Sequence, residues 1–251
     1  MKYSYSNINT FIQCPYRWKL QYIDKLKVIP PTNADNALYL GLALHKGVEE
    51  WSVDAAVEEY KSHYPILTDA HISWIMQLEY QVPRLLELLP KGGVHEIRID
   101  TKTFVGFADY VVGDTIYDFK FSNNIDGYLH SPQLSIYKHY LEKTHPDMKI
   151  NHLKFVFVPK VMIRQRKRSN ETIMEFRNRV KEMLPDTEIK IIEVPFDENA
   201  VTDFKKCCTL LNKLNREKEY DKLVKTPSRL CDWCQYKDYC QSDGEIDYMI
   251  L

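Results

Sequence analysis

Three side chains of types that perform hydrolysis stand within twelve residues of one another: Asp109, Asp118 and Lys120. Mg²⁺ prefers oxygen ligands and is typically held by one or two carboxylates together with a substrate phosphate. A lysine beside two carboxylates offsets their mutual repulsion, and it can stabilise charge that builds on a phosphoryl group. The set therefore fits metal-assisted cleavage of a phosphate ester. From these residues alone, a surface hairpin with two solvated aspartates is an equally good interpretation.

A β-hairpin over residues 106–121 would bring these side chains together. The pair Gly113-Asp114 separates two runs that are rich in β-branched and aromatic residues, which is a hairpin signal. With this pair as the turn, Asp109 lies directly opposite Asp118, and the alternation of side chains puts the lysine on the same face. The opposite face is predicted to be core and carries Tyr110, Val112, Tyr117, Phe119 and Phe121.

The spacing of Asp109, Asp118 and Lys120 resembles the D…(D/E)-x-K core of the PD-(D/E)XK nuclease superfamily. Three further elements resemble motifs of its RecB-like members, in the same order: Gly41-Leu-Ala-Leu-His45 (G-x-x-x-H), Gly106-Phe-Ala-Asp109 (G-x-x-D) and Gln133-Leu-Ser-Ile-Tyr137 (Q-x-x-x-Y). The resemblance covers about residues 4–240 and extends to AddB-like and CRISPR-associated RecB-like exonucleases. Each motif is weak alone, but their common order makes them strong together.

The resemblance implies a role for each of these residues. Asp109, Asp118 and Lys120 would be catalytic, with the lysine orienting the attacking water. The ligands of one or two Mg²⁺ or Mn²⁺ ions would be His45, Asp109, Asp118 and the carbonyl oxygen of Phe119. Gln133 and Tyr137, one helical turn apart, would position the DNA strand. Without the resemblance, His45 would be interpreted as a core histidine, and the Gln–Tyr pair as ordinary partly buried neighbours.

A basic segment follows the apolar strand predicted at residues 152–159. It is the densest run of positive charge in the chain, and we expect it to contact DNA phosphates through Arg164, Arg166, Lys167 and Arg168. Most charge runs are only solvated, so the alternative is a solvent-facing loop. The position of this run, after a sheet with an acidic site, favours the phosphate contact.

Three cysteines near the C-terminus form the pattern C-x₂-C-x₅-C: Cys231, Cys234 and Cys240. Closely spaced thiols in a chain without secretory features are typical of a metal site. Such a site needs a fourth ligand, and the segment offers no histidine. The candidates are the remaining cysteines, Cys14, Cys207 and Cys208. Spacing alone does not choose among them.

The resemblance does choose, because RecB-like nucleases with an iron–sulfur cluster place one ligand before the nuclease core and three after it. Cys14 with the three C-terminal cysteines matches that layout, which implies a [4Fe–4S] cluster. Zinc is the alternative, since four cysteines also bind Zn²⁺. A cluster here would close a loop of more than two hundred residues, so we expect a structural role. Cys207 and Cys208 lie in a helical pattern and are expected to be buried thiols.

The elements that must position these residues are predicted from periodicity and from turn residues. Helices are expected at about residues 35–63, 70–90 with a kink at Pro83, 131–142, 171–184 and 197–219, and strands at 94–100, 152–159 and 188–195. The first of these helices would bury Leu38, Leu42 and Val48 on the face of His45. Glu96 could reach the metal site from strand 94–100, but a solvated carboxylate is the better interpretation there.

We therefore predict an α/β fold with a mixed β-sheet flanked by helices, as in the restriction-endonuclease-like core of PD-(D/E)XK enzymes. The whole chain, residues 1–251, would form a single nuclease domain. Residues 94–160 would supply the catalytic sheet and the Q-x-x-x-Y helix. The cysteine cluster would join residues 1–30 to residues 227–251.

Composition and net charge say less about the function than the motifs do. The 251 residues are 44% hydrophobic, with no apolar run long enough to span a bilayer and no signal peptide, so we expect a cytoplasmic protein. The net charge of −1 argues against a protein that coats nucleic acid, and it allows binding through a local basic groove.

The expected function is a metal-dependent nuclease, an exonuclease acting on single-stranded DNA in recombination, replication or repair. The alternatives are a structure-specific or nicking endonuclease on the same fold, and a catalytically silent DNA-binding adaptor. The chain has no P-loop motif, so a helicase or another recombination or CRISPR protein would be the partner that unwinds DNA. The sequence leaves the oligomeric state open.

Overall fold

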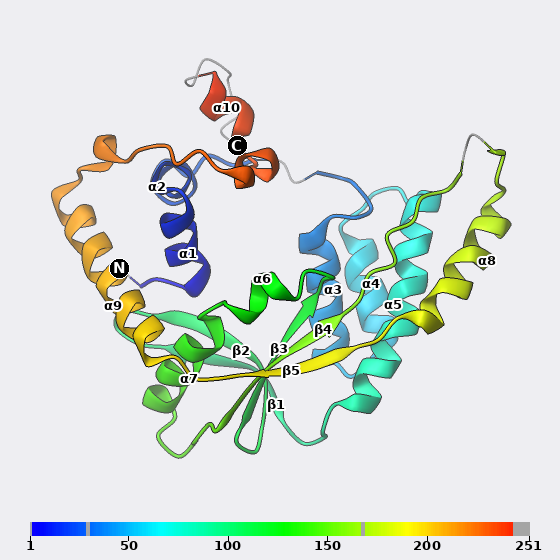
Figure 1. Ribbon diagram of the computed structural model, residues 1–251, viewed down its shortest axis with the longest axis horizontal. Coiled ribbons are helices and arrows are strands. Elements are labelled where there is room, and N and C mark those ends of the chain that lie inside the picture. The colour runs from blue at the N-terminus through cyan, green and yellow to red at the C-terminus, as the bar shows by residue number, and fades with distance from the viewer. Residues whose placement is uncertain (1, 29–30, 167–168, 243–251) are drawn as a thin grey trace. The chain divides into compact units, whose positions relative to one another are not determined.

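The structure is a computed structural model that describes residues 2–28, 31–166 and 169–242 (Figure 1). The chain forms two compact units. The terminal unit comprises Met1–Pro30, Ile99–Gly106 and Asp197–Leu251, and the sheet unit comprises Pro31–Arg98 and Phe107–Phe196. Both segments that the sequence predicts to be joined by cysteines belong to the terminal unit.

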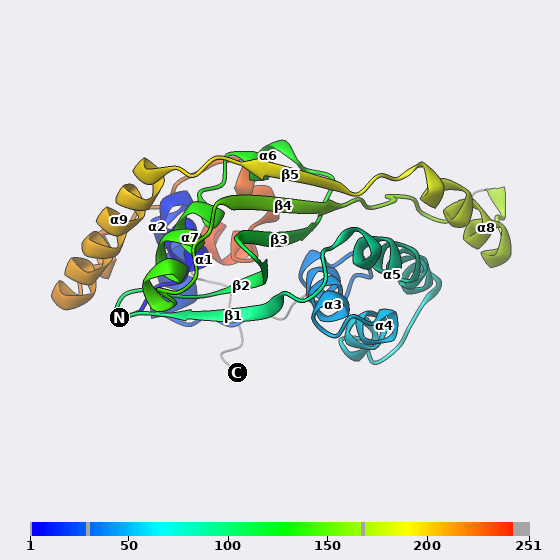
Figure 2. The same ribbon diagram turned by 90° about the horizontal axis from the view of Figure 1, so that it is seen from below.

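A mixed five-stranded sheet has the strand order β1-β2-β3-β4-β5 (Figure 2). The strands are β1 (Val94–Asp100), β2 (Val105–Val112), β3 (Thr115–Phe121), β4 (His152–Val158) and β5 (Lys190–Val194). β3 pairs with β2 antiparallel and with β4 parallel, while β4 pairs with β5 antiparallel. The parallel step requires a crossover, which α6 (Asp126–Leu129) and α7 (Gln133–Thr144) supply. The predicted α/β class with a mixed sheet flanked by helices is confirmed.

The register of the β2–β3 hairpin is the predicted one. Tyr110 pairs with Tyr117, and Val112 pairs with Thr115, so the turn falls on the two residues between them. Gly113 has a φ of 58°, which a glycine adopts without strain. The predicted apolar face is part of the main core of the sheet unit, with Tyr110, Tyr117, Phe119 and Phe121 buried and Val112 packed against them.

Helices α3 (Ala37–Glu49), α4 (Val53–Ser62) and α5 (Asp69–Leu88) form a group beside the sheet (Figure 2). The prediction of one helix over residues 35–63 is wrong. The chain leaves the helix after Glu49, Trp51 takes a φ of 54°, and the Ser52 hydroxyl accepts a hydrogen bond from Ala55 N to begin α4. α3 and α4 pack closely because Gly47 has no side chain: a Cβ there would lie 2.7 Å from the Cβ of Ala56.

The predicted buried face of α3 is also wrong in part. The residues that enter the core are Leu40, Ala43, Leu44, Gly47 and Val48. Leu38 and Leu42 are instead 58% and 41% exposed, although Val48 is buried as predicted. The buried stripe is set by contact with α4 and α5, which the sequence of this helix alone does not contain.

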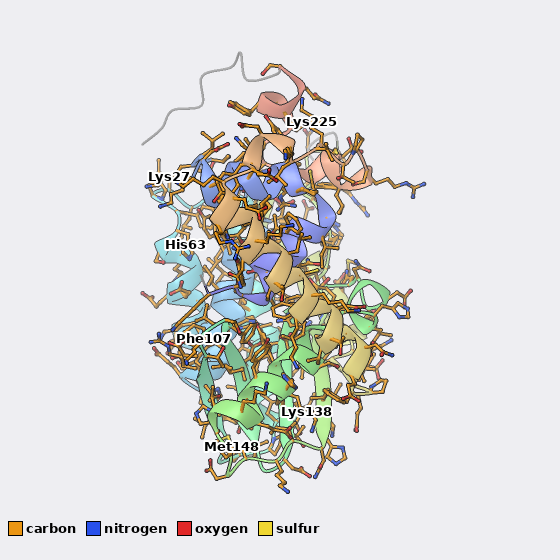
Figure 3. All side chains as sticks on the ribbon, turned by 90° about the vertical axis from the view of Figure 1, so that its left-hand side faces the viewer. Lys27, His63, Phe107, Lys138, Met148 and Lys225 are labelled. Atoms are coloured by element: carbon orange, nitrogen blue, oxygen red, sulfur yellow. The ribbon has the colours of Figure 1, made fainter. Side chains whose placement is uncertain are left out.

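The remaining helix of the sheet unit is α8 (Ile173–Met183), and α7 begins two residues later than predicted. α7 is tied to the loop that leads into β4. Lys138, labelled in Figure 3 together with Met148 of that loop, lies 2.9 Å from Glu142 and donates to the carbonyl oxygen of Ile150. This anchor fixes the helix that carries Gln133 and Tyr137.

The terminal unit is mainly helical. Its elements are α1 (Tyr5–Gln13), α2 (Pro15–Trp18), a π-helical turn (Lys19–Ile23), α9 (Glu198–Glu217), two 3₁₀ turns (Tyr220–Lys222 and Arg229–Trp233) and α10 (Lys237–Gln241). Trp18 is fully buried and donates to the side chain of Asn7 at 2.8 Å. The hydroxyl of Tyr3 donates to Asn212 of α9 at 3.0 Å. None of the described helices has the length and apolar character needed to cross a membrane.

Candidate active site

The two aspartates and the lysine meet on one face of the β2–β3 hairpin, as the register requires. Asp109 Oδ2 accepts a hydrogen bond from the backbone N–H of Phe119 at 2.9 Å, and Lys120 Nζ lies 2.5 Å from Asp118 Oδ2. The side chains of Asp109 and Asp118 are only 11% and 1% exposed. The alternative of two solvated aspartates on a surface hairpin is therefore wrong.

Helix α3 brings His45 to this pair. Its Nε2 lies 3.7 Å from Asp109 Oδ2 and 3.2 Å from the carbonyl oxygen of Phe119. Its Nδ1 lies 3.8 Å from Glu96 Oε1. The structure thus places two of the predicted metal ligands, Asp109 and the Phe119 carbonyl, beside a third, the imidazole of His45.

Glu96 is a further candidate ligand, which the sequence analysis set aside as a solvated carboxylate. One ligand atom from each of His45, Glu96 and Asp109 lies within 4.8 Å of the others, a spacing that suits a metal ion. Glu96 has a φ of 49°, a left-handed backbone that non-glycine residues adopt rarely and that is often found at functional sites. The only signal in the sequence was its position in the strand before the hairpin, because local backbone strain cannot be read from residue types.

Asp118 is held apart from that group of three by its own partners. Its Oδ1 accepts a hydrogen bond from Gln133 Nε2 at 2.8 Å, while Lys120 contacts the other oxygen. Gln133 Nε2 also lies 3.4 Å from the hydroxyl of Tyr137. The Q-x-x-x-Y pair therefore reaches the acidic site from α7, and its contact in this structure is with a carboxylate.

Burial and like charge shift the titration of the site. Burial, followed by the charge of Asp118, raises the pKa of Asp109 to about 7. Burial disfavours the imidazolium of His45, but the carboxylates of Asp109, Glu96 and Asp118 outweigh it and raise the pKa of His45 to about 9. Burial likewise opposes the charge of Lys120, and Asp118 and Asp109 raise its pKa overall.

This donor set fits a hard divalent cation. It offers carboxylate oxygens, one backbone carbonyl oxygen and one imidazole nitrogen, which are ligands that Mg²⁺ and Mn²⁺ accept. A cation would also remove the repulsion that raises the pKa of Asp109, since a bound divalent ion is the largest charge in such a site. The residues present therefore fit the metal that the sequence predicts.

The predicted DNA-binding residues Arg164 and Arg166 lie elsewhere in the sheet unit. They line a cavity of about 1010 Å³ together with Thr68 and Trp74 at the start of α5. The segment is anchored by Gln77, whose side chain bonds the backbone N–H and carbonyl of Val161 at 2.8 and 3.1 Å. Lys167 and Arg168 lie outside the described residues.

In the terminal unit, one cavity of about 300 Å³ is lined by all four predicted cluster ligands, Cys14, Cys231, Cys234 and Cys240. The sulfur atoms of Cys14 and Cys231 accept hydrogen bonds at 3.4 Å from the backbone N–H groups of Arg17 and Ser228. Lys225, labelled in Figure 3, donates to the Cys240 carbonyl at 2.6 Å and lies over the ring of Tyr16.

The other three cysteines affect the pKa of the Cys240 thiol. Burial raises the pKa of the Cys240 thiol; Lys225 opposes this rise, and Cys14, Cys234 and Cys231 add to it. Among the described residues, no three of these sulfur atoms lie within 4.8 Å of one another. Of the two cysteines expected to be ordinary thiols, Cys208 is buried in α9 and Cys207 is partly buried.

The sequence and the fold both resemble known proteins. The chain matches the model of the PD-(D/E)XK nuclease superfamily over residues 2–241. Its fold is similar to the crystal structure of a Eubacterium rectale protein described as a "putative exonuclease", with a TM-score of 0.56, 15% identity, and coverage of 94% of this chain and 87% of that one. No curated protein sequence matches the chain. Because the family model spans nearly all of the sequence, the chain belongs to the PD-(D/E)XK nuclease superfamily.

Proposed function

We propose that this protein is a Mg²⁺- or Mn²⁺-dependent deoxyribonuclease that removes nucleotides from DNA ends. The observation that carries the proposal is the buried arrangement of Asp109, Asp118 and Lys120 with His45 and Glu96 beside it. The structurally similar protein from Eubacterium rectale is described as an exonuclease. We therefore favour cleavage at DNA ends over cleavage within a strand.

The metal would be held by His45, Glu96, Asp109, Asp118 and the Phe119 carbonyl oxygen. When bound, it would lower the pKa of a water molecule and offset charge on the departing oxygen. His45 Nε2 faces two acceptors, the Phe119 carbonyl and Asp109, which favours a proton on this nitrogen. This proton must leave before the nitrogen can act as a ligand.

Lys120 is the group of the chain itself that acts on the reacting atoms. Its side chain is 15% exposed and Asp118 fixes its ammonium, so it stays charged and can orient the attacking water or stabilise charge on a phosphoryl oxygen through hydrogen bonds. Gln133 holds Asp118 in place through the 2.8 Å bond to Oδ1. We propose that Gln133 and Tyr137 also contact the scissile strand, and that Arg164 and Arg166 contact phosphates farther along it.

We further propose that the chain is RecB-like and carries a [4Fe–4S] cluster bound by Cys14, Cys231, Cys234 and Cys240. The donor set fits, since four thiols line one cavity and two of their sulfur atoms accept N–H groups. Four thiolates also bind Zn²⁺, and the resemblance to RecB-like nucleases is what favours the cluster. Its role would be structural, and a helicase or a recombination or CRISPR protein would be the partner.

The test is cleavage of end-labelled linear DNA and closed circular DNA with Mg²⁺, Mn²⁺ or EDTA, using protein purified without oxygen. Lys120→Ala is the active-site variant, and Lys149→Ala, at an exposed position after α7, is the matched control. We expect metal-dependent release from free ends that only Lys120→Ala abolishes. Cutting of closed circles would make the enzyme an endonuclease, and absence of cleavage by wild-type protein would refute the proposal.

A further inference from the structure

A cavity of about 630 Å³ adjoins the metal site in the sheet unit. Glu59 of α4 and Glu96 of β1 line one part of it. The rest is lined by seven residues of α3: Ala37, Leu38, Gly41, Leu42, His45, Lys46 and Glu49. His45 and Glu96 belong both to this cavity and to the group of three that suits a metal ion. Whatever occupies the cavity therefore lies next to the reacting phosphate.

Gly41 lies at the floor of this cavity, in the interior of α3. A glycine in the middle of a helix costs about 0.5–1 kcal/mol relative to alanine. Apart from its two chain neighbours and the backbone of its own helix, no atom of the described residues lies within 4 Å of the position that a Cβ on Gly41 would take. By contrast, Gly47 in the same helix is needed for packing, because a Cβ there would lie 2.7 Å from Ala56. The packing of the chain therefore does not require a glycine at position 41, and the space beside it is open to a ligand.

Leu38 and Leu42 flank this glycine on the same side of α3. They are spaced four residues apart and, with His45 three residues later, follow one face of the helix. The two leucines are 58% and 41% exposed, whereas the core stripe of α3 is fully buried. An exposed apolar pair that runs directly into a polar site is typical of a contact surface for the apolar part of a ligand.

The charges around the cavity exclude a phosphate as its occupant. Lys46 is its only basic side chain besides His45, and Lys46 Nζ lies 3.1 Å from Glu49 and 2.7 Å from Glu50. Two further carboxylates lie on the rim: Glu59, which is 3.1 Å from His63, and Glu96, which is 3.8 Å from His45. A DNA backbone laid along this face would be repelled, while a deoxyribose or a nucleobase would not.

We propose that the face formed by Leu38, Gly41 and Leu42 seats the sugar and base of one unstacked nucleotide beside the scissile phosphate. In a duplex, each base is stacked between its neighbours and the phosphates face outward, so this contact requires a single strand or a frayed end. The inference rests on the proposed nuclease function and deepens it. It makes the substrate a strand whose terminal bases are free.

The first test combines protein and substrate changes. The substrates are single-stranded oligonucleotides, with or without abasic nucleotides at the terminal positions, and the protein is wild type, Leu38→Ser/Leu42→Ser or the control Leu88→Ser. Leu88 is an equally exposed leucine, at 53%, on α5. We expect the abasic substrate and the double variant each to lower kcat/KM about tenfold, in line with the 1–3 kcal/mol that one base contact contributes.

Combining the two changes should cost little more than either one alone, because both remove the same contact. The control should behave as wild type. Full additivity, or unchanged kcat/KM for the double variant, would overturn the inference while the nuclease function stood. If wild-type protein cleaved neither single-stranded nor duplex DNA, the proposed function itself would fail. If the double variant kept full activity but changed oligomeric state in light scattering, the occupant would be a second copy of the chain.

The second test uses Gly41. Gly41→Ala should raise Tm by about 2 °C, since the helix gains and no contact is strained. Gly41→Leu, which fills the cavity, should raise KM for single-stranded DNA about tenfold or more while the fold stays intact. A stable Gly41→Leu variant with wild-type KM would show that nothing binds on this face.

Discussion

Replacing Asp109 with asparagine should stabilise the metal-free protein while it abolishes activity. Asparagine has the same shape and keeps an oxygen that can accept the 2.9 Å hydrogen bond from Phe119 N–H. It removes a charge that is buried beside Asp118 and costly without a metal. Active sites often contain such locally unfavourable groups, and removing them commonly exchanges function for stability.

The size of the gain follows from the pKa. Burial and Asp118 raise the pKa of Asp109 from 3.8 to about 7. At about 1.36 kcal/mol per pKa unit, the ionised carboxylate costs the fold about 4 kcal/mol at pH 8. The pKa of about 7 already includes the attraction of Asp109 for charged His45, so the net gain expected of the variant is also on the order of 4 kcal/mol. That gain corresponds to a Tm increase of roughly 8–16 °C.

The upward shift of the Asp109 pKa determines the pH range in which the two proteins differ in stability. A carboxyl whose folded pKa lies above its unfolded value destabilises the fold progressively as pH rises from about 4 to about 7. The assay is calorimetry of wild type, Asp109→Asn and the exposed control Asp147→Asn in EDTA between pH 4 and 8.5. The Tm difference should be small near pH 4 and largest above pH 7, and Mn²⁺ should stabilise only the proteins with Asp109. A Tm for Asp109→Asn below that of wild type at pH 8, or a difference independent of pH, would refute the reasoning.

Three further outcomes are expected. Asp118→Ala and Lys120→Ala should each abolish cleavage in the end-label assay, because the first removes a proposed metal ligand and the second removes the ammonium that orients the attacking water. Full activity in either variant would contradict the assigned roles. Glu96→Gln should weaken Mn²⁺ binding about tenfold or more in calorimetric titration without unfolding the protein, because a Glu96 oxygen is one of the three grouped ligand atoms. An unchanged Kd for Mn²⁺ would exclude Glu96 from the metal site. Cys231→Ser should lose the visible absorbance of the cluster and lower Tm together, whereas a colourless variant with wild-type Tm would rule out a structural cluster.

The catalytic hairpin could be predicted from the sequence because its geometry is local. A two-residue turn at Gly113-Asp114 and the period-two alternation of side chains fix which residues share a face, wherever the hairpin packs. The register, the apolar face and the meeting of Asp109, Asp118 and Lys120 all follow from that short-range rule. The gathering of four cysteines in one cavity followed from family resemblance, because spacing alone left the fourth ligand open.

Tertiary structure decided the features that depend on contacts between distant segments. The helix predicted over residues 35–63 breaks at Trp51 because α4 must fold back on α3, and that packing turns Leu38 and Leu42 outward. Glu96 reaches the metal site through a left-handed backbone that no residue pattern indicates. Sequence periodicity records which residues of an element share a face, but it does not record which face a neighbouring element will cover. The residue types therefore indicated metal-assisted hydrolysis. Only the packing of α3 and β1 around the hairpin decided which side chains could bind the metal and which surface lies beside them.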